Sequence, residues 1–522
     1  MKIEKENKQK ELKNRLKKYE KQEEATSTLQ APSISGYYHV KIRIKTERMT
    51  AQECDRLRII TNRDTRIIKD YLRIIYHNEE KILRNDSKVA KTQLDKLTLT
   101  TSKKTQHKLR TTVPHDLKKS YPRCSHDEFI ECRDKAIWTY ESWKAQQKQS
   151  KEDLSRPQFK KKTPRIYYKG LEHRGTFRVI PTPDNTLAKL WLDLRDSLDT
   201  KRSGRTNHKR LMLPLAYSPY HKKKLILDNV KTLELVYKSK EQQWCAHFTL
   251  QYTVPLYQST QPPAVLGVDL GIKKTAVAVL LTPTGKVIME ELCFIVNKER
   301  QAKMWRLEKQ IKSIQRELDT RNYNGQPHKQ LNVKLYQLRR RLRSVTQQEL
   351  GYAVNQLVDF ILQLKKQYNL FVSVGYPKYI RKSQPRGSGN KSLRRQLHKW
   401  CYRLFITKLQ HKLTQHGFEP HRVVAVNESW TSQRCSKCNS LNTTRTKQGK
   451  FNCHDCNYEI NADLNGARNI GKRLIKYALK PEHGYTSIRD TLTNDYHSLK
   501  LYKCLQPLSQ WLKYSVKNLS SR

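Results

Sequence analysis

The chain has 522 residues, with 104 Lys and Arg against 48 Asp and Glu, so its formal net charge is +56. A compact protein with this surplus repels itself strongly unless a polyanion is bound, which argues against an ordinary small-molecule enzyme and for a nucleic-acid partner. The hydrophobic fraction of 36% exceeds that of a disordered chain, and the length predicts several domains.

The first third of the chain is expected to be mainly helical. Residues 1–35 form a Lys/Glu-rich tail, and 37–45 alternate like a strand. An apolar stripe of Leu and Ile at helical spacing predicts a helix over 50–83. We expect 85–124 to be irregular and 126–147 to form a second helix.

Short alternating segments then recur over 166–255 and predict a small β-barrel or sandwich, including a strand at 223–228. Residues 191–198 are expected to form a short helix within it. The helical segment 50–155 would thus interrupt a barrel.

The second half predicts three consecutive antiparallel strands, then helices alternating with two further strands. That order is the order of an RNase H-like nuclease core. The expected strands are 265–270, 275–281, 286–292, 370–376 and 421–427, and the expected helices are 298–321, 327–368, 393–416 and one that begins near 463.

Four cysteines are clustered in two Cys-x-x-Cys knuckles, CSKC at 435–438 and CHDC at 453–456. This spacing predicts one tetrahedral Zn²⁺ held by Cys435, Cys438, Cys453 and Cys456. Four thiolates leave no open position, so the site is expected to be a structural zinc ribbon. It could contact nucleic acid or brace the fold.

Two aspartates lie where a nuclease centre would be expected, Asp269 in GVDLG and Asp463 in NADLNGARNI. Alone, Asp269 is equally typical of a turn, and Asp463 is more typical of a helix N-cap. Because both flank the RNase H-like strand order, we interpret them as ligands of two Mg²⁺ ions, about 3.5–4 Å apart, that act in phosphodiester hydrolysis.

A third carboxylate is missing from the expected strand 370–376, where Val374 and Gly375 stand in place of a strand-end acid. Glu428 follows strand 421–427 and precedes the first cysteine knuckle. A lone glutamate is usually a surface loop residue, but this position favours Glu428 as the third ligand.

The segments GVDLGIKKTAVAV, VNESWTSQRCSKC and FNCHDCNYEINADLNGARNI resemble the RuvC and zinc-ribbon region of the TnpB and Fanzor proteins, over about 265–295 and 420–472. These are transposon-encoded, RNA-guided DNA endonucleases related to type V CRISPR effectors. The resemblance implies Asp269 and Asp463 as the first and third RuvC positions. The second position departs from the usual pattern, and Glu428 fits the displaced glutamate of Fanzors, so we expect a Fanzor-like protein.

The resemblance implies a multidomain α+β fold: a wedge-type β-barrel with a helical recognition insertion, and an RNase H-like RuvC domain with an inserted zinc ribbon. It also implies a guide RNA (omega RNA) and double-stranded target DNA as partners. The expected domains are a tail (1–35), the barrel (36–49 and 156–260), the recognition insertion (50–155), RuvC (261–427 and 463–475), the ribbon (428–462) and a C-terminal extension (476–522).

Basic clusters are usually solvated helix faces, but the overall surplus predicts that some contact phosphate. The expected nucleic-acid contacts are Lys160, Lys161, Lys162, Lys222, Lys223, Lys224, Arg339, Arg340 and Arg341. Tyr167, Tyr168, Trp138 and Trp143 could stack on bases, although core packing is more typical of tryptophan. The loop 381–392 is compatible with a lid or with a linker.

Export and membrane insertion are not expected, because the longest strongly apolar run is 275–281 and the basic N-terminus has no apolar signal core. We therefore expect an intracellular protein without a membrane partner and with reduced cysteines, nuclear in a eukaryotic or viral host and otherwise in the cytoplasm or nucleoid. The oligomeric state stays open. Two other functions also stay open: a nuclease-dead RNA-guided regulator, and a guide-independent nucleic-acid-binding zinc-ribbon protein.

Overall fold

The computed structural model describes two compact units, 35–253 and the residues from 254 onward together with 32–34. The described residues are 32–79, 87–100, 110–149, 154–157, 163–169, 176–184, 187–196, 198, 210–239, 241–271, 276–295, 298–323, 328–376, 402–419, 422–446 and 449–479. Several expectations lie wholly or partly outside them: most of the tail 1–35, the lysines at 160–162, the loop 381–392, the first part of the expected helix 393–416 and most of the C-terminal extension. None of the described helices is long and apolar enough to cross a membrane.

The first unit contains two antiparallel sheets that share one hydrophobic core. The four-stranded sheet has the order β1 (Ser33–Arg43), β7 (Gln243–Pro255), β6 (Val230–Lys238), β2 (Ile166–Tyr168), and the three-stranded sheet has the order β3 (Phe177–Pro181), β4 (Leu190–Arg195), β5 (Arg210–Pro214). Single bridges, Ile44 to Leu215 and Lys169 to Phe177, connect the two sheets. The continuous barrel therefore stays a prediction.

The helices of this unit are α2 (Ala51–His77), α4 (Ser87–Thr98), α5 (Leu117–Ser120), α6 (His126–Gln149) and the short α7 (Pro219–Lys224). A capping box between Thr50 and Glu53 fixes the start of α2. The apolar stripe predicted for α2 is buried as expected. The sequence did not reveal a buried ion network between α2 and α6, in which Arg165 Nη1 lies 2.8 Å from Glu128 Oε1.

Three local predictions are wrong. Residues 85–124 are not wholly irregular, because α4 and α5 lie there. The expected helix 191–198 is wrong over 191–195, because Leu190, Leu192 and Leu194 alternate on the buried face of β4. Residues 223–228 are not a strand, because Pro219 begins α7 and a 3₁₀ turn follows at Leu227–Asn229.

Two aromatic assignments also change. Core packing was favoured for Trp138, but this residue of α6 is 46% exposed. Tyr167 is 1% exposed in the core and cannot stack on a base.

The second unit is built on a five-stranded sheet in the order β10 (Val287–Ile295), β9 (Ala276–Leu281), β8 (Pro263–Asp269), β11 (Asn369–Tyr376), β12 (Val423–Asn427). β8, β9 and β10 pair antiparallel, whereas β11 pairs parallel to both β8 and β12. This agrees with the expected element order, three antiparallel strands followed by two crossover strands. The carboxyl ends of β8, β11 and β12 consequently meet at one edge of the sheet.

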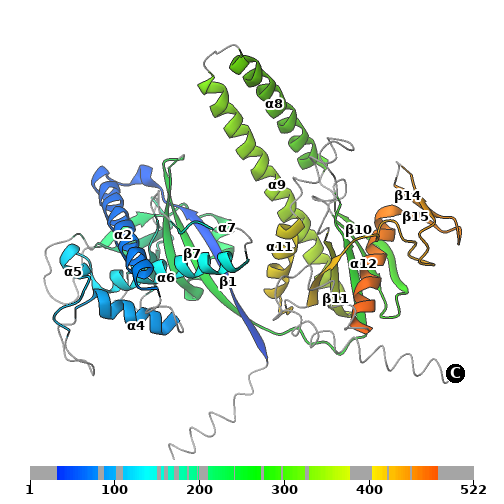
Figure 1. Cartoon of the computed structure of the whole chain (residues 1–522), viewed down its shortest axis with the longest axis horizontal. Coiled ribbons are helices and arrows are strands. Elements are labelled where there is room, and N and C mark those ends of the chain that lie inside the picture. Colours follow the sequence, from blue (N-terminus) through cyan, green and yellow to red (C-terminus); the bar gives the residue numbers. More distant parts are fainter. Residues whose placement is uncertain are drawn as a thin grey trace, which may run out of the picture. The chain divides into compact units, whose positions relative to one another are not determined.

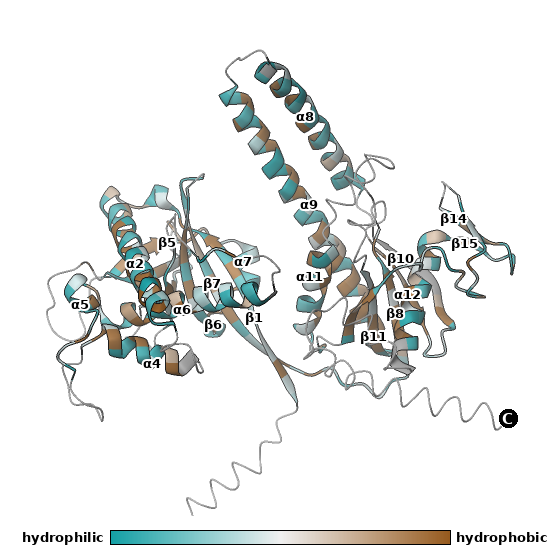
Figure 2. Ribbon diagram, viewed as in Figure 1, coloured by the Kyte–Doolittle hydropathy of each residue, from teal (hydrophilic) through white to brown (hydrophobic). Residues whose placement is uncertain are grey.

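Helices cover both faces of this sheet (Figure 1). α9 (Lys329–Leu364) and α11 (Tyr402–Thr414) enclose the larger apolar core, and α12 (Ala462–Leu479) packs on the opposite face. α8 (Lys298–Tyr323) pairs with the first half of α9 in the predicted long hairpin, which extends away from the sheet. Polar residues dominate the outer part of this hairpin (Figure 2).

Candidate active site and metal centre

The three predicted carboxylates lie on neighbouring elements of the second unit. Asp269 ends β8, Glu428 directly follows β12, and Asp463 is in the first turn of α12. β11 runs between β8 and β12, with Val374 opposite Val268 and with Gly375 opposite Val426. Asp269 and Glu428 therefore reach the same sheet edge from either side of β11.

Two glycines make room for these carboxylates. A Cβ atom on Gly375 would lie 2.9 Å from Glu428 Oε2, and a Cβ atom on Gly466 would lie 2.6 Å from Asp269 Oδ2. Both distances are shorter than ordinary van der Waals contacts. Glu428 thus extends its carboxylate over the strand position that lacks an acid of its own.

A backbone contact between β8 and α12 brings Asp463 close to Asp269. A Cβ atom on Gly267 would lie 2.1 Å from the carbonyl oxygen of Ala467, and one on Gly471 would lie 3.4 Å from Gly267 Cα. Only glycine permits this approach at residue 267. The glycine that opens GVDLG therefore positions the helix that carries Asp463.

The carboxylates interact electrostatically, and Asp269 is the member common to both interactions. Burial, followed by the charge of Asp463, raises the pKa of Asp269 to about 7, against the lowering effect of Arg445. Burial, followed by the charge of Asp269, raises the pKa of Glu428 to about 8, against the lowering effect of Arg473. Groups perturbed in this way are typical of functional sites.

Glu428 begins a tight turn that α12 fixes. The Thr431 hydroxyl donates to the Glu428 carbonyl at 2.7 Å, and Arg473 donates to the carbonyls of Asn427 and Ser429. Asn469 Nδ2 donates to the Thr431 carbonyl at 2.8 Å. Asp463 and the turn after Glu428 are thus held by one helix.

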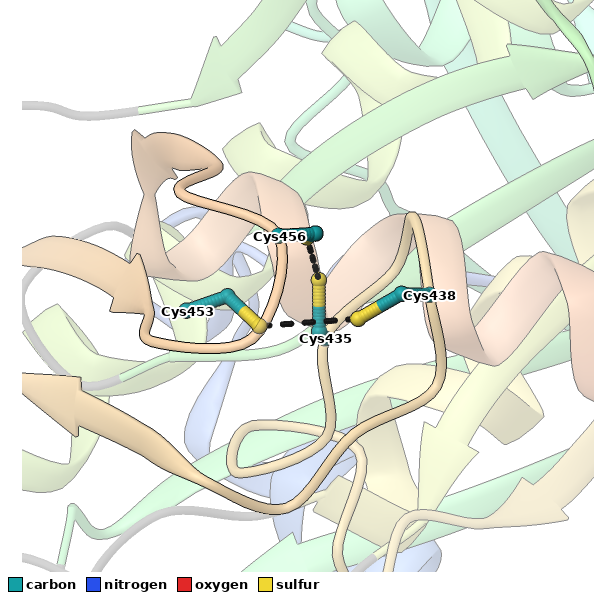
Figure 3. Close-up of side chains that lie close together, drawn as sticks. All are labelled: Cys435, Cys438, Cys453 and Cys456. Carbon is teal, nitrogen blue, oxygen red and sulfur yellow. Dashed lines mark hydrogen bonds between the residues drawn. The ribbon is translucent and has the colours of Figure 1, made fainter.

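The four cysteines converge as predicted (Figure 3). Cys435 Sγ lies 3.7 Å from Cys456 Sγ, and Cys438 Sγ lies 3.5 Å from Cys453 Sγ. Among the described residues, these four are the metal-ligating group whose ligand atoms all lie within 4.8 Å of one another. The thiol set fits one structural zinc ion.

Each knuckle ends on an asparagine in the left-handed backbone region. Asn439 follows the first knuckle with φ 67°, and Asn457 follows the second with φ 48°. Asparagine tolerates this conformation better than most residues. The repeated Cys-x-x-Cys-Asn is therefore a sequence signal for the knuckle fold that the cysteine spacing alone does not include.

The ribbon is joined to the carboxylate site. Its strands are β13 (Thr443–Arg445), β14 (Lys450–Cys453) and β15 (Glu459–Asn461). Arg445 Nη2 lies 3.2 Å from Asp463 Oδ1. Asn465, fully buried in α12, accepts from the Ser436 backbone at 2.8 Å. Neither Arg445 nor Asn465 was singled out from the sequence.

The predicted basic contacts that the structure describes are exposed and fall into both units. Lys222, Lys223 and Lys224 lie on α7, and Arg339, Arg340 and Arg341 lie on α9. Their role in nucleic-acid binding stays a prediction.

One family model matches the segment that carries the ribbon. Residues 402–470 match the family described as Cas12f1-like, TNB domain. A Cas12f1 endodeoxyribonuclease of Sulfoacidibacillus thermotolerans is 39% identical over 75 residues, 14% of this chain and 17% of that protein. A Cas12f2 endodeoxyribonuclease of a Micrarchaeota archaeon is 26% identical over 239 residues, 44% of this chain and 40% of that protein.

A putative RNA-guided DNA endonuclease of Escherichia coli, InsQ, is 48% identical over 50 residues, 9% of this chain and 12% of that protein. The chain thus spans less than half of each of these curated relatives. A solved Cas12f1–sgRNA–target DNA complex covers 84% of this chain and 99% of its own, with a TM-score of 0.52 and 14% identity, which shows a common mixed α+β fold. These matches make the chain similar to the Cas12f- and TnpB-like family of RNA-guided endonucleases, and they do not single out the Fanzor branch.

Proposed function

We propose that the protein is an RNA-guided DNA endonuclease that cuts target DNA through Asp269, Glu428 and Asp463. The main support for this proposal is that the three carboxylates converge at one sheet edge, where two of them have a raised pKa. The similarity to RNA-guided endodeoxyribonucleases supports the guide RNA and double-stranded DNA as partners.

The carboxylate set fits divalent cations. Glu428 Oε2 is buried without a hydrogen-bond partner, and charge repulsion links Asp269 to both neighbouring carboxylates. Hard oxygen ligands suit Mg²⁺, which when bound activates a water and stabilises the leaving oxygen of a phosphodiester. Asp269, Glu428 and Asp463 would hold the ions, with Asp269 as the carboxylate that interacts with both of the others.

The surrounding residues prepare this site in distinct ways. Arg473 and Asn469 fix the turn after Glu428, so its carboxylate is held over Gly375. Arg445 pairs with Asp463 from the ribbon and offers a positive charge where a phosphate would enter. The zinc ribbon thereby supports the site. The position of Glu428, after β12 and not within β11, favours a Fanzor-like arrangement.

The test is cleavage of DNA that matches the RNA copurifying with the protein. We expect a discrete RNA with a variable end, and Mg²⁺-dependent cutting that Asp269→Asn abolishes without loss of RNA or DNA binding. Retained cutting by Asp269→Asn would refute the site. Binding without cutting by the wild type would indicate a nuclease-dead regulator, and absence of a discrete RNA would indicate a guide-independent protein.

A further inference from the structure

Trp430 has a backbone conformation that tryptophan rarely adopts. Its φ is 67°, in the left-handed region. It is the third residue of a turn closed by the Thr431 N–H, which donates to the Glu428 carbonyl at 3.1 Å. Glycine or asparagine usually occupies such a position, because a side chain there meets the backbone. For a bulky residue this conformation is a genuine outlier.

Core packing does not account for Trp430. The residue is 62% exposed, and it belongs to none of the hydrophobic clusters among the described residues. The turn itself would form more readily with glycine. Strained residues of this kind cluster where a ligand is bound.

The position of the turn indicates which ligand. Trp430 follows Glu428 by two residues, and α12 fixes both flanks of the turn through Arg473 to the Ser429 carbonyl and Asn469 to the Thr431 carbonyl. The Arg434 backbone donates to the Trp430 carbonyl at 2.9 Å, which closes the far side. An exposed indole on a fixed turn that begins at a proposed phosphodiester-cutting residue fits an unstacked nucleobase.

We infer that Trp430 contacts the substrate by stacking on an unpaired nucleotide of the DNA strand that is cut, next to the scissile phosphate. The inference rests on the proposed function and adds a substrate contact to it. A base held on the indole would place the adjoining phosphate at the carboxylates, and every base offers a π face, so the contact would be independent of sequence.

Trp430→Gly separates this contact from a structural role. Relief of the left-handed conformation should leave the melting temperature unchanged or higher, whereas cleavage should slow by about five- to a hundredfold, the range of a lost base–aromatic stack. Trp430→Phe should recover most of the rate. Gln242→Gly, at another exposed residue of positive φ (47°), is the matched control and should change stability alone.

An abasic scan of the cut strand identifies the stacked nucleotide. Removal of that base should slow the wild type about as much as Trp430→Gly does, and should slow Trp430→Gly no further. A Trp430→Gly variant that cuts at the wild-type rate would overturn the inference. An abasic site that slows cleavage by the same factor in the wild type and in Trp430→Gly would also overturn it.

A binding measurement keeps this inference distinct from the proposed function. The target DNA carries 2-aminopurine at one position at a time, and binding is measured in Ca²⁺. At one position the wild type should quench the 2-aminopurine fluorescence, and Trp430→Gly should not. If the wild type fails to cut, the proposed function fails, and this quenching still decides the contact. Equal quenching in both proteins at every position would refute it.

Discussion

The residues around the carboxylates show how Glu428 reaches the sheet edge at which Asp269 lies. Gly375 has no side chain, and Glu428 Oε2 lies 2.9 Å from the position that its Cβ would take. Asp269 and Asp463 could be predicted from the sequence because they sit in short motifs at element ends. Gly466 could not, since its importance lies in a contact with Asp269 across the fold.

Gly466→Ala should cost activity although alanine favours a helix. Its Cβ would lie 2.6 Å from Asp269 Oδ2, so the carboxylate must move, and we expect cleavage to slow by about 100-fold. Gly351→Ala on α9 is the matched control, because nothing lies within 4 Å of its Cβ, and it should stabilise the protein by about 1 kcal/mol. Equal cleavage by both variants would contradict the packing of Asp269 against α12.

The raised pKa values of Asp269 and Glu428 predict how stability and Mg²⁺ respond to pH. Carboxyls of the unfolded chain titrate near pH 4, whereas these two keep their protons to higher pH in the metal-free folded state. The proton binding adds to the free energy of unfolding, and this contribution is lost as pH rises from about 4 toward about 7 and 8. Mg²⁺ requires the deprotonated forms, so it should raise the melting temperature more at about pH 8.5 than at about pH 6.

Glu428→Gln should weaken both the pH dependence and the Mg²⁺ effect in those melting curves, because an amide cannot ionise. If Mg²⁺ raises the melting temperature equally at both pH values and in both proteins, the ion binds elsewhere.

At the scale of elements, periodicity succeeded where one face is buried and failed where segments are short. The α2 stripe predicted its helix, whereas the four-residue α5 and the six-residue β4 offer too few periods to separate helix, strand and loop. α12 illustrates the other limit. Its start was predicted, but the buried Asn465 and Asn469, which hold the ribbon and the Glu428 turn, make their bonds only in the folded chain.

The ribbon is therefore expected to support the active site through zinc. Cys435→Ser should abolish binding of the roughly one zinc ion per chain and lower the melting temperature by several degrees. Cleavage should also slow, because the ribbon contacts α12, the helix that carries Asp463. Zinc content, melting and cleavage are measured together. Cys54→Ser on α2, outside the cluster, should change none of them, and full zinc retention by Cys435→Ser would refute the site.

At the scale of the whole molecule, the charge of +56 is distributed over both units. The order of the strands along the second unit was predictable, because β8, β9, β11 and β12 are mainly apolar runs. The sequence did not show that the first unit forms two sheets joined by single bridges, since short strands do not specify their partners.

The exposed arginines of α9 should contribute to binding through phosphate neutralisation. Replacement of Arg339, Arg340 and Arg341 by glutamine should weaken binding to all sequences alike and reduce the slope of log K against log salt by up to about three. The matched control replaces them by lysine, which retains the charge and should retain the slope. An unchanged slope in the glutamine variant would show that these arginines do not contact phosphate.

Single-turnover cleavage in Mg²⁺ by the wild type and by Glu428→Gln, on DNA matched to the copurified RNA, tests the central claim most directly. We predict that the wild type cuts and that Glu428→Gln binds the same DNA but cuts at least about 1,000-fold more slowly, since the loss of one Mg²⁺ ligand removes transition-state stabilisation. Equal cutting by the two proteins would contradict the assignment of Glu428 as the displaced third carboxylate.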